Sequence, residues 1–202
     1  MPKIFYIHGG TTHSTQEKFY EYLENKSIAL EKPAPIWPDQ LEENFPNHHI
    51  MRIKMPNKNN ADYKAWEIIF KKYLSHINPD DVIIGFSLGA TFLLKFLSHN
   101  KLPVQSAQMI LIAGPIDSEG SPEELCNGFE TKKIELDSQT LQSQSKQMHL
   151  FYATDDPVVP ILQMQKIKPH LPHAKFIELQ NRGGHFITSD FPELINQINN
   201  AT

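Results

Sequence analysis

The sequence has a single cysteine, Cys126, among 202 residues, so no disulfide can form within the chain. This count also excludes metal sites that are built on paired cysteines. No apolar run approaches the ~20 residues that a membrane-spanning helix needs. Residues 1–7 lead directly into a strand pattern, without the apolar region or the cleavage pattern of a signal peptide. We therefore expect a cytoplasmic protein without a membrane association.

The sequence also lacks an excess of positive charge. It holds 19 Lys and Arg residues against 23 Asp and Glu residues, a formal net charge of −4, with no long run of either sign. A nucleic-acid-binding protein would need a basic face, so we expect no nucleic-acid partner. None of the 10 histidines has Cys, Asp or Glu companions at the spacing typical of zinc ligands, so we expect no metal and no other cofactor.

Six short apolar runs predict the strands of one sheet. Most of them are continuous rather than alternating, as is typical of strands that are buried on both faces. Helical patterns lie between most of the runs, which indicates a parallel sheet with right-handed crossovers. We therefore predict an α/β fold, a three-layer sandwich whose mostly parallel six-stranded sheet has helices on both faces. The predicted strands are residues 4–7, 50–53, 82–84, 109–113, 150–153 and 175–179.

We expect residues 1–202 to form a single domain, because a chain of this length with 40% hydrophobic residues can bury one core. Two segments exceed a minimal alternation of strands and helices. Residues 12–35 insert a helix, with a capping box at Ser14 and Glu17, and a proline-containing linker, and this insertion is a candidate lid. Residues 115–147 form a variable polar excursion. Both leave from the carboxyl end of a strand, where open parallel sheets bind ligands.

The motif G-x-S-x-G occurs at residues 85–89, between a buried strand pattern and a helical pattern. A strand, a sharp turn and a helix form the context of a nucleophile elbow, in which the turn exposes a serine oxygen. The two glycines are needed because chain segments approach too closely there for a Cβ atom. Ser87 is therefore the predicted nucleophile.

A serine nucleophile needs a base, and the base needs an acid that fixes its tautomer. His185 is the predicted base, since it lies on a glycine-rich loop after the last predicted strand. We choose Asp156 as the acid because Asp-x-x-Val-Pro is the usual spacing for it, which leaves Asp155 to serve the turn. Asp117, which follows the preceding strand, and Asp155 remain alternatives.

The oxyanion that forms on the substrate needs two donors. One should be the backbone N–H of Leu88, directly after the nucleophile. The other should come from the His-Gly-Gly-Thr loop after the first strand, with Gly10 as the preferred donor and Thr11 as the alternative. The candidates for the wall of the substrate pocket are Phe86, His13 and Trp37.

Together these segments resemble the α/β-hydrolases and, more narrowly, the small serine hydrolases related to retinoblastoma-binding protein 9 and its bacterial relatives. The resemblance implies a compact hydrolase with a six-stranded sheet and a triad of Ser87, Asp156 and His185. The segments that carry it span most of the chain and are Tyr-Ile-His-Gly-Gly at 6–10, Met-Pro-Asn at 55–57, the elbow at 85–89, Asp-Asp-Pro at 155–157 and Gly-His-Phe at 184–186.

The chain also departs from these relatives. The insertion at residues 12–35 is longer than the small members need. The human member binds its partner through a Leu-x-Cys-x-Glu motif, and Leu125-Cys126-Asn127 breaks that spacing, so this binding role is not transferred. The protein partner stays open.

We predict a serine hydrolase that cleaves a small acyl ester, thioester or amide through an acyl-enzyme on Ser87. Its partner in this prediction is a small-molecule acyl substrate. Because a fold does not determine a function, the alternative is a protein-interaction module on a hydrolase scaffold, with little or no turnover.

Overall fold

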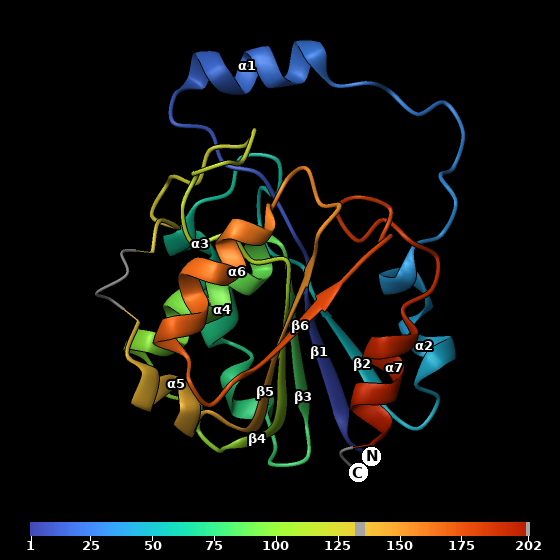
Figure 1. The fold of residues 1–202 in the computed structure, drawn as a ribbon, viewed down its shortest axis with the longest axis vertical. Coiled ribbons are helices and arrows are strands. Elements are labelled where there is room, and N and C mark those ends of the chain that lie inside the picture. The colour runs from blue at the N-terminus through green and yellow to red at the C-terminus, as the bar shows by residue number, and fades with distance from the viewer. Residues whose placement is uncertain (132–135, 201–202) are drawn as a thin grey trace.

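The computed structural model describes residues 1–131 and 136–200. Its centre is a six-stranded sheet in the order β2-β1-β3-β4-β5-β6, in which every neighbouring pair is parallel (Figure 1). All six predicted apolar runs form strands, so the predicted α/β sheet is confirmed. The strands are β1 Lys3–Ile7, β2 His49–Ile53, β3 Val82–Phe86, β4 Ser106–Ile112, β5 Ser145–Ala153 and β6 Lys175–Leu179.

Helices cover both faces of this sheet and complete the predicted three layers. Helices α3, α4, α5 and α6 lie on one side, and α2 and α7 lie on the other (Figure 1). Gln108 of β4 reaches the second side, where its amide donates to the carbonyl of Ile198 in α7 (3.3 Å). The bounds are α2 Leu41–Asn44, α3 Tyr63–Lys71, α4 Leu88–His99, α5 Ser138–Ser143, α6 Ile161–Ile167 and α7 Pro192–Asn199, with 3-10 turns η1 Trp37–Gln40, η2 Leu74–His76 and η4 Lys168–His170.

The central helix α4 is buried along almost its whole length. Phe92 and Phe96 pack edge-on against Phe70 of α3, with ring centroids 5.4 and 5.1 Å apart. Edge-to-face aromatic pairs stabilise a contact beyond the area they bury. Because α4 is held between α3 and the sheet, its first turn, which follows Ser87, is fixed relative to the ends of the central strands.

Residues 115–147 contain more regular structure than the sequence predicts. The helix α5 lies within this segment, and β5 begins at Ser145, ahead of the predicted start at residue 150. The early part of β5 is polar because it pairs with polar residues of β4, with Ser145 beside Ser106 and Gln147 beside Gln108. Residues 132–135 of this segment lie outside the described residues.

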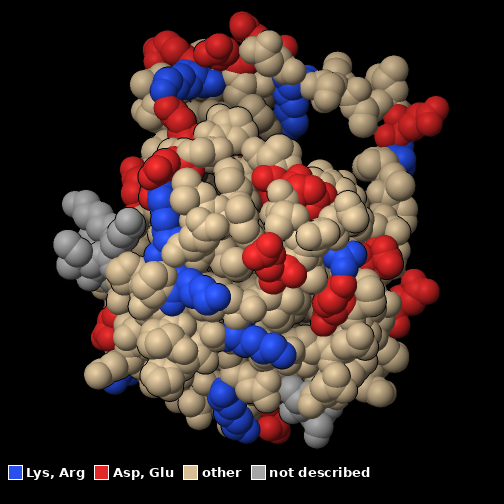
Figure 2. All heavy atoms as spheres, viewed as in Figure 1, with Lys and Arg blue, Asp and Glu red and all other residues tan. Residues whose placement is uncertain are grey.

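Helix α1, Gln16–Asn25, stands apart from the body of the molecule, and none of its residues is buried (Figure 1). Its N-cap is Thr15, whose hydroxyl accepts from the Lys18 N–H (3.3 Å), so the predicted cap at Ser14 is wrong by one residue. Polar contacts tether the helix, because Glu124 forms an ion pair with Lys18 and accepts from the Ser14 N–H (3.1 Å). Figure 2 shows acidic and basic side chains close together on this helix.

No helix within residues 1–131 and 136–200 has both the length and the apolar character that crossing a bilayer requires.

We expect His149 of β5 to make the stability of the fold depend on pH. Its side chain is 4% exposed, and its Nδ1 has no hydrogen-bond partner among the described residues. Burial, assisted by the charge of Lys175, lowers the pKa of His149 to about 4. Between pH 6.5 and 4 the unfolded chain therefore binds a proton that the folded chain does not. The free energy of unfolding should fall by about 2–3 kcal/mol from pH 7 to pH 4.

Urea unfolding at pH 7, 5.5 and 4 checks this expectation. His149→Leu places an apolar side chain at this buried position and removes the titrating group, so the variant should lose less stability on acidification than the parent. His173→Leu, at an exposed position, is the control and should follow the parent. Identical pH dependence of the parent and His149→Leu would contradict the assignment.

Candidate active site

Ser87 lies at the turn between β3 and α4 in a rarely populated backbone conformation, with φ 53° and ψ −122°. Side-chain-bearing residues seldom adopt this region, and such strain gathers at functional sites. The turn is tight, since a Cβ atom on Gly85 would lie 2.7 Å from the Gly89 carbonyl oxygen. The Ser87 N–H donates to the Ile112 carbonyl at the end of β4 (2.7 Å). The strand–turn–helix geometry predicted around residues 85–89 is therefore present.

His185 and Asp156 form a hydrogen-bonded pair. The distance from Nδ1 of His185 to Oδ2 of Asp156 is 2.7 Å, and the Asp156 side chain is fully buried. The other oxygen, Oδ1, accepts from the N–H groups of Val158 and Val159, each at 2.9 Å. A carboxylate held at both oxygens has a fixed orientation, and it fixes the ring that donates to it. Nε2 of His185 is therefore the nitrogen that remains for acid–base chemistry.

The two alternative acids have other partners. Asp155 accepts from the N–H groups of Arg182 and Gly184, so it ties its own turn to the histidine loop. Burial acts to raise the pKa of Asp155, but these backbone donors prevail and lower it. Asp117 pairs with Lys166, with Nζ 2.6 Å from Oδ2. Neither carboxylate contacts His185 among the described contacts, which favours Asp156.

Ser87 and His185 line the same cavity. Phe86, which precedes Ser87, packs against the His185 ring with centroids 5.1 Å apart. In the described part of the chain, no hydrogen bond joins the Ser87 hydroxyl to His185. Such bonds are often long in enzymes without substrate and tighten once the substrate binds.

The loop after β1 lies directly against Ser87. A Cβ atom on Gly9 would be 3.0 Å from the Ser87 Cβ and 3.5 Å from its Oγ. The Thr11 N–H donates to the Lys58 carbonyl (2.8 Å), so this N–H is not free for an oxyanion, and the alternative donor Thr11 is not supported. Gly10 lines the cavity with Ser87. The Leu88 N–H belongs to the first turn of α4, where N–H groups lack intrahelical acceptors.

His8 holds this loop in place, a role that the sequence did not predict. Its Nε2 accepts from the Met55 N–H (3.0 Å), so the proton is on Nδ1, which donates to the Gly9 carbonyl (2.6 Å). The ring therefore fixes the orientation of the peptide group between Gly9 and Gly10. The sequence signal that could have indicated this role is the pair of glycines that directly follows His8.

A central cavity of about 530 Å³ opens at Ser87. Of the predicted wall residues, Phe86 lines it. His13 instead lines an adjoining side cavity of about 400 Å³, where its ring packs on Tyr22 of α1 (4.8 Å between centroids). The central cavity is lined by Tyr6, His8, Gly9, Gly10, Thr11, Tyr22, Lys58, Asn59, Phe86, Ser87, Glu123, His185 and Ile187.

Trp37 was predicted as a wall residue, and the structure corrects this prediction. Its side chain is 1% exposed and lines none of the described cavities near Ser87. The ring packs edge-on against Phe86 (5.8 Å) and Phe191 (5.6 Å) instead. Full burial of an aromatic ring is more favourable than partial exposure at a cavity wall. Trp37 therefore lies in the core and packs against Phe86, which itself lines the cavity.

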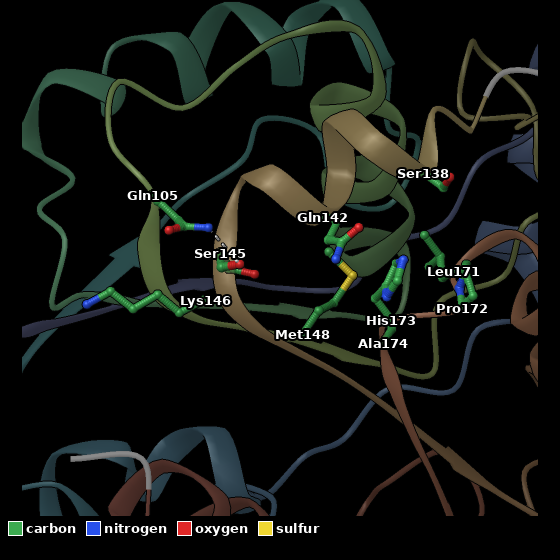
Figure 3. A pocket seen from close by; sticks show the side chains of 10 residues that line it. All are labelled: Gln105, Ser138, Gln142, Ser145, Lys146, Met148, Leu171, Pro172, His173 and Ala174. Atoms are coloured by element: carbon green, nitrogen blue, oxygen red, sulfur yellow. Dashed lines mark hydrogen bonds between the residues drawn. The ribbon is translucent and has the colours of Figure 1, made fainter.

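A further cavity of about 170 Å³ lies away from this site, at the amino ends of β5 and β6. Figure 3 shows Gln142 of α5 close to Met148 and His173 in its wall. Gln105 donates to the Ser145 carbonyl on another side (3.3 Å). Since Ser87 follows the carboxyl end of β3, this cavity is not part of the candidate active site. Among the described residues, no group of three or more His, Cys, Asp or Glu side chains could hold a metal ion.

Comparison with known proteins shows the family of this chain. The family model described as serine hydrolase matches residues 32–195. The chain belongs to the serine hydrolase family. YdeN of Bacillus subtilis (strain 168), which is named as a hydrolase, is similar at 23% identity over 188 residues, covering 93% of this chain and 87% of that protein.

Two solved structures are similar to this chain in fold. The crystal structure of the ydeN gene product from B. subtilis has a TM-score of 0.74 and 18% identity, over 100% of this chain and 98% of that one. MGS-M2, an α/β-hydrolase enzyme from a Medee basin deep-sea metagenome, has a TM-score of 0.59 and 12% identity, covering 99% of this chain and 88% of that chain. The predicted α/β-hydrolase fold of this serine hydrolase is thereby confirmed.

Proposed function

We propose that this protein hydrolyses a small acyl ester, thioester or amide through an acyl-enzyme on Ser87. The observation that carries the proposal is the hydrogen bond of 2.7 Å between His185 and a fully buried Asp156, together with a cavity that both His185 and the strained Ser87 line. A base whose tautomer is fixed and a serine at a sharp turn are the two parts that acyl transfer needs. The YdeN relative, named as a hydrolase, supports the same class of reaction.

In the first half-reaction, Oγ of Ser87 attacks the substrate carbonyl carbon while Nε2 of His185 takes the serine proton. Asp156 stabilises the imidazolium that results. The carbonyl oxygen becomes an oxyanion and accepts from the N–H groups of Leu88 and Gly10. His185 then gives its proton to the leaving oxygen, sulfur or nitrogen, and the acyl group stays on Ser87.

Water completes the second half-reaction. His185 removes one proton from the water as its oxygen attacks the acyl carbon, and the oxyanion again accepts from Leu88 and Gly10. Collapse of this intermediate returns the proton to Oγ of Ser87 and releases the acid. The net reaction adds one water across the acyl bond, with no cofactor in the balance.

Residues 12–35 form a partial cover of the site in this proposal. Tyr22 of α1 lines the central cavity together with Ser87 and His185. Lys26 of the same segment donates to the Asn59 side chain (3.3 Å), and Asn59 lines that cavity too. A helix tethered by polar contacts, with no buried residue, can move without exposing a core.

A fluorophosphonate probe and a panel of p-nitrophenyl esters test the proposed function. The probe should label one serine per chain, and peptide mapping should find it on Ser87. Short-chain esters should be turned over. Labelling at another serine would contradict the role of Ser87. Absence of both labelling and turnover would favour an interaction module on a hydrolase scaffold.

A further inference from the structure

Three cavities meet at the candidate active site, and one charged residue lines all of them. The first is the central cavity, and the second is the side cavity beneath α1. The third, the inner pocket, has a volume of only about 20 Å³ and is lined by Ser87 together with Pro115, Leu125 and Val158. Ser87 lines the central cavity and the inner pocket, whereas Glu123 lines all three.

The other carboxylates of the inner pocket are already paired. Asp117 forms an ion pair with Lys166 and accepts from the Gln163 amide (2.9 Å). Glu124 forms an ion pair with Lys18 of α1. The Glu123 carboxylate, by contrast, has no hydrogen bond or ion pair with any residue in the described ranges. A charge without a partner near a nucleophile is available to a substrate.

The environment of Glu123 is the candidate active site itself. Burial raises the pKa of Glu123, while His185 and His13 act to lower it and Asp156 acts to raise it. These are the groups of the proposed base, its acid and the side cavity. Partial desolvation makes an ionised carboxylate less stable unless a positive group approaches it. Glu123 is nevertheless an exposed residue, so a cationic group can reach it from solvent, and screening by water keeps their attraction modest.

The backbone around Glu123 is fixed to the loop that carries the proposed oxyanion donor. The Glu123 N–H donates to Oγ of Ser121 (3.1 Å). On the following residues, the Glu124 carbonyl accepts from the Thr12 hydroxyl (2.6 Å), and the Cys126 N–H donates to the same hydroxyl (3.0 Å). Thr12 belongs to the loop after β1, so the positions of Glu123 and Gly10 are coupled. The backbone that carries Glu123 is thus held in place, whereas no described contact fixes its carboxylate, which can turn toward a ligand.

We propose that Glu123 determines specificity by binding a cationic group of the substrate, so that this hydrolase prefers esters carrying an ammonium group a few atoms from the scissile carbonyl. This inference rests on the proposed function. With the carbonyl at Ser87, the ammonium group lies beside Glu123 in the central cavity, which both residues line. Of the two lysines that share a cavity with Glu123, Lys58 lines only the central cavity, and Lys18 of the side cavity is paired with Glu124.

A matched pair of esters tests the inference. Choline esters and 3,3-dimethylbutyl esters of the same acid have nearly the same shape and differ in charge, so their kcat/KM ratio isolates the effect of the cation. With acetyl, propionyl and butyryl groups, the parent should prefer the choline ester by about threefold, which corresponds to about 0.65 kcal/mol and is the size expected for an exposed ion pair. In Glu123→Gln, which keeps the shape and removes the charge, the ratio should fall to about 1.

The control for net charge is Glu130→Gln, at an exposed position of the same segment that lines none of the three cavities. Its ratio should match that of the parent. Equal turnover of both esters by the parent, or the same loss of preference in both variants, would overturn the role of Glu123 alone. Absence of turnover of every ester, neutral or charged, would overturn the proposed function and this inference with it.

Discussion

Replacing Ser87 with alanine should lower kcat for a short-chain p-nitrophenyl ester by at least about 10³-fold. The substitution removes the only protein atom that forms a bond with the acyl carbon in the proposed mechanism. His185 and the N–H groups of Leu88 and Gly10 remain, so a small rate above that in buffer should persist, from oxyanion binding and from water activated by the histidine. Stopped assays at high enzyme concentration can measure this residual rate.

Ser98→Ala is the matched control for this experiment. Ser98 lies in α4, the helix that follows Ser87, and Ser87 and Ser98 are each 7% exposed. Its hydroxyl donates to the Leu94 carbonyl (2.8 Å), away from the cavities at Ser87. Its kcat should stay within a factor of about two of the parent, because a lost local hydrogen bond affects stability more than chemistry. A Ser87→Ala variant that keeps more than a tenth of the parent activity would exclude Ser87 as the nucleophile.

The sheet could be predicted because its strands are buried on both faces. A continuous apolar run such as residues 82–84 has no polar residue to face solvent, and it is therefore typical of a strand that is buried on both faces. The start of β5 could not be predicted, since Ser145 and Gln147 are polar and occupy the sheet only because Ser106 and Gln108 of β4 lie beside them. That pairing joins residues far apart in the sequence, and no local pattern reports it.

The residues of the candidate site also divide into those marked by a local sequence motif and those that depend on long-range packing. Ser87 and its glycines form a local motif, and the spacing after β5 favours Asp156 over Asp155, in agreement with the contacts of both carboxylates. The walls of the cavity come from loops whose packing depends on the whole fold. Trp37 was therefore assigned to the wrong environment, and Glu123 and Tyr22 were missed as residues of the cavity wall. A single carboxylate in a polar segment has no sequence pattern that would mark it as part of a site.

Replacing Gly89 with alanine should destabilise the fold by about 4 kcal/mol or more, a large part of the stability of a typical domain. In an ordinary helix, the same substitution stabilises by up to about 1 kcal/mol. Here a Cβ atom would lie 2.5 Å from the Ile7 carbonyl oxygen and 2.7 Å from that of His8. Both are backbone atoms at the end of β1, so no side-chain rotation relieves the overlap, and the steric effect exceeds the helix preference.

Urea unfolding measures this loss, and Ala90→Gly separates it from helix propensity. That variant removes a buried Cβ atom at the next position of α4 and should lose about 1–2 kcal/mol, from helix propensity and from the lost burial. A Gly89→Ala protein as stable as the parent would mean that β1 can move away from α4. Such movement would carry the loop of His8 and Gly10 away from Leu88, so the two proposed oxyanion donors could not stay aligned. The close approach at Gly89 thus connects the stability of the sheet to the geometry that acyl transfer requires.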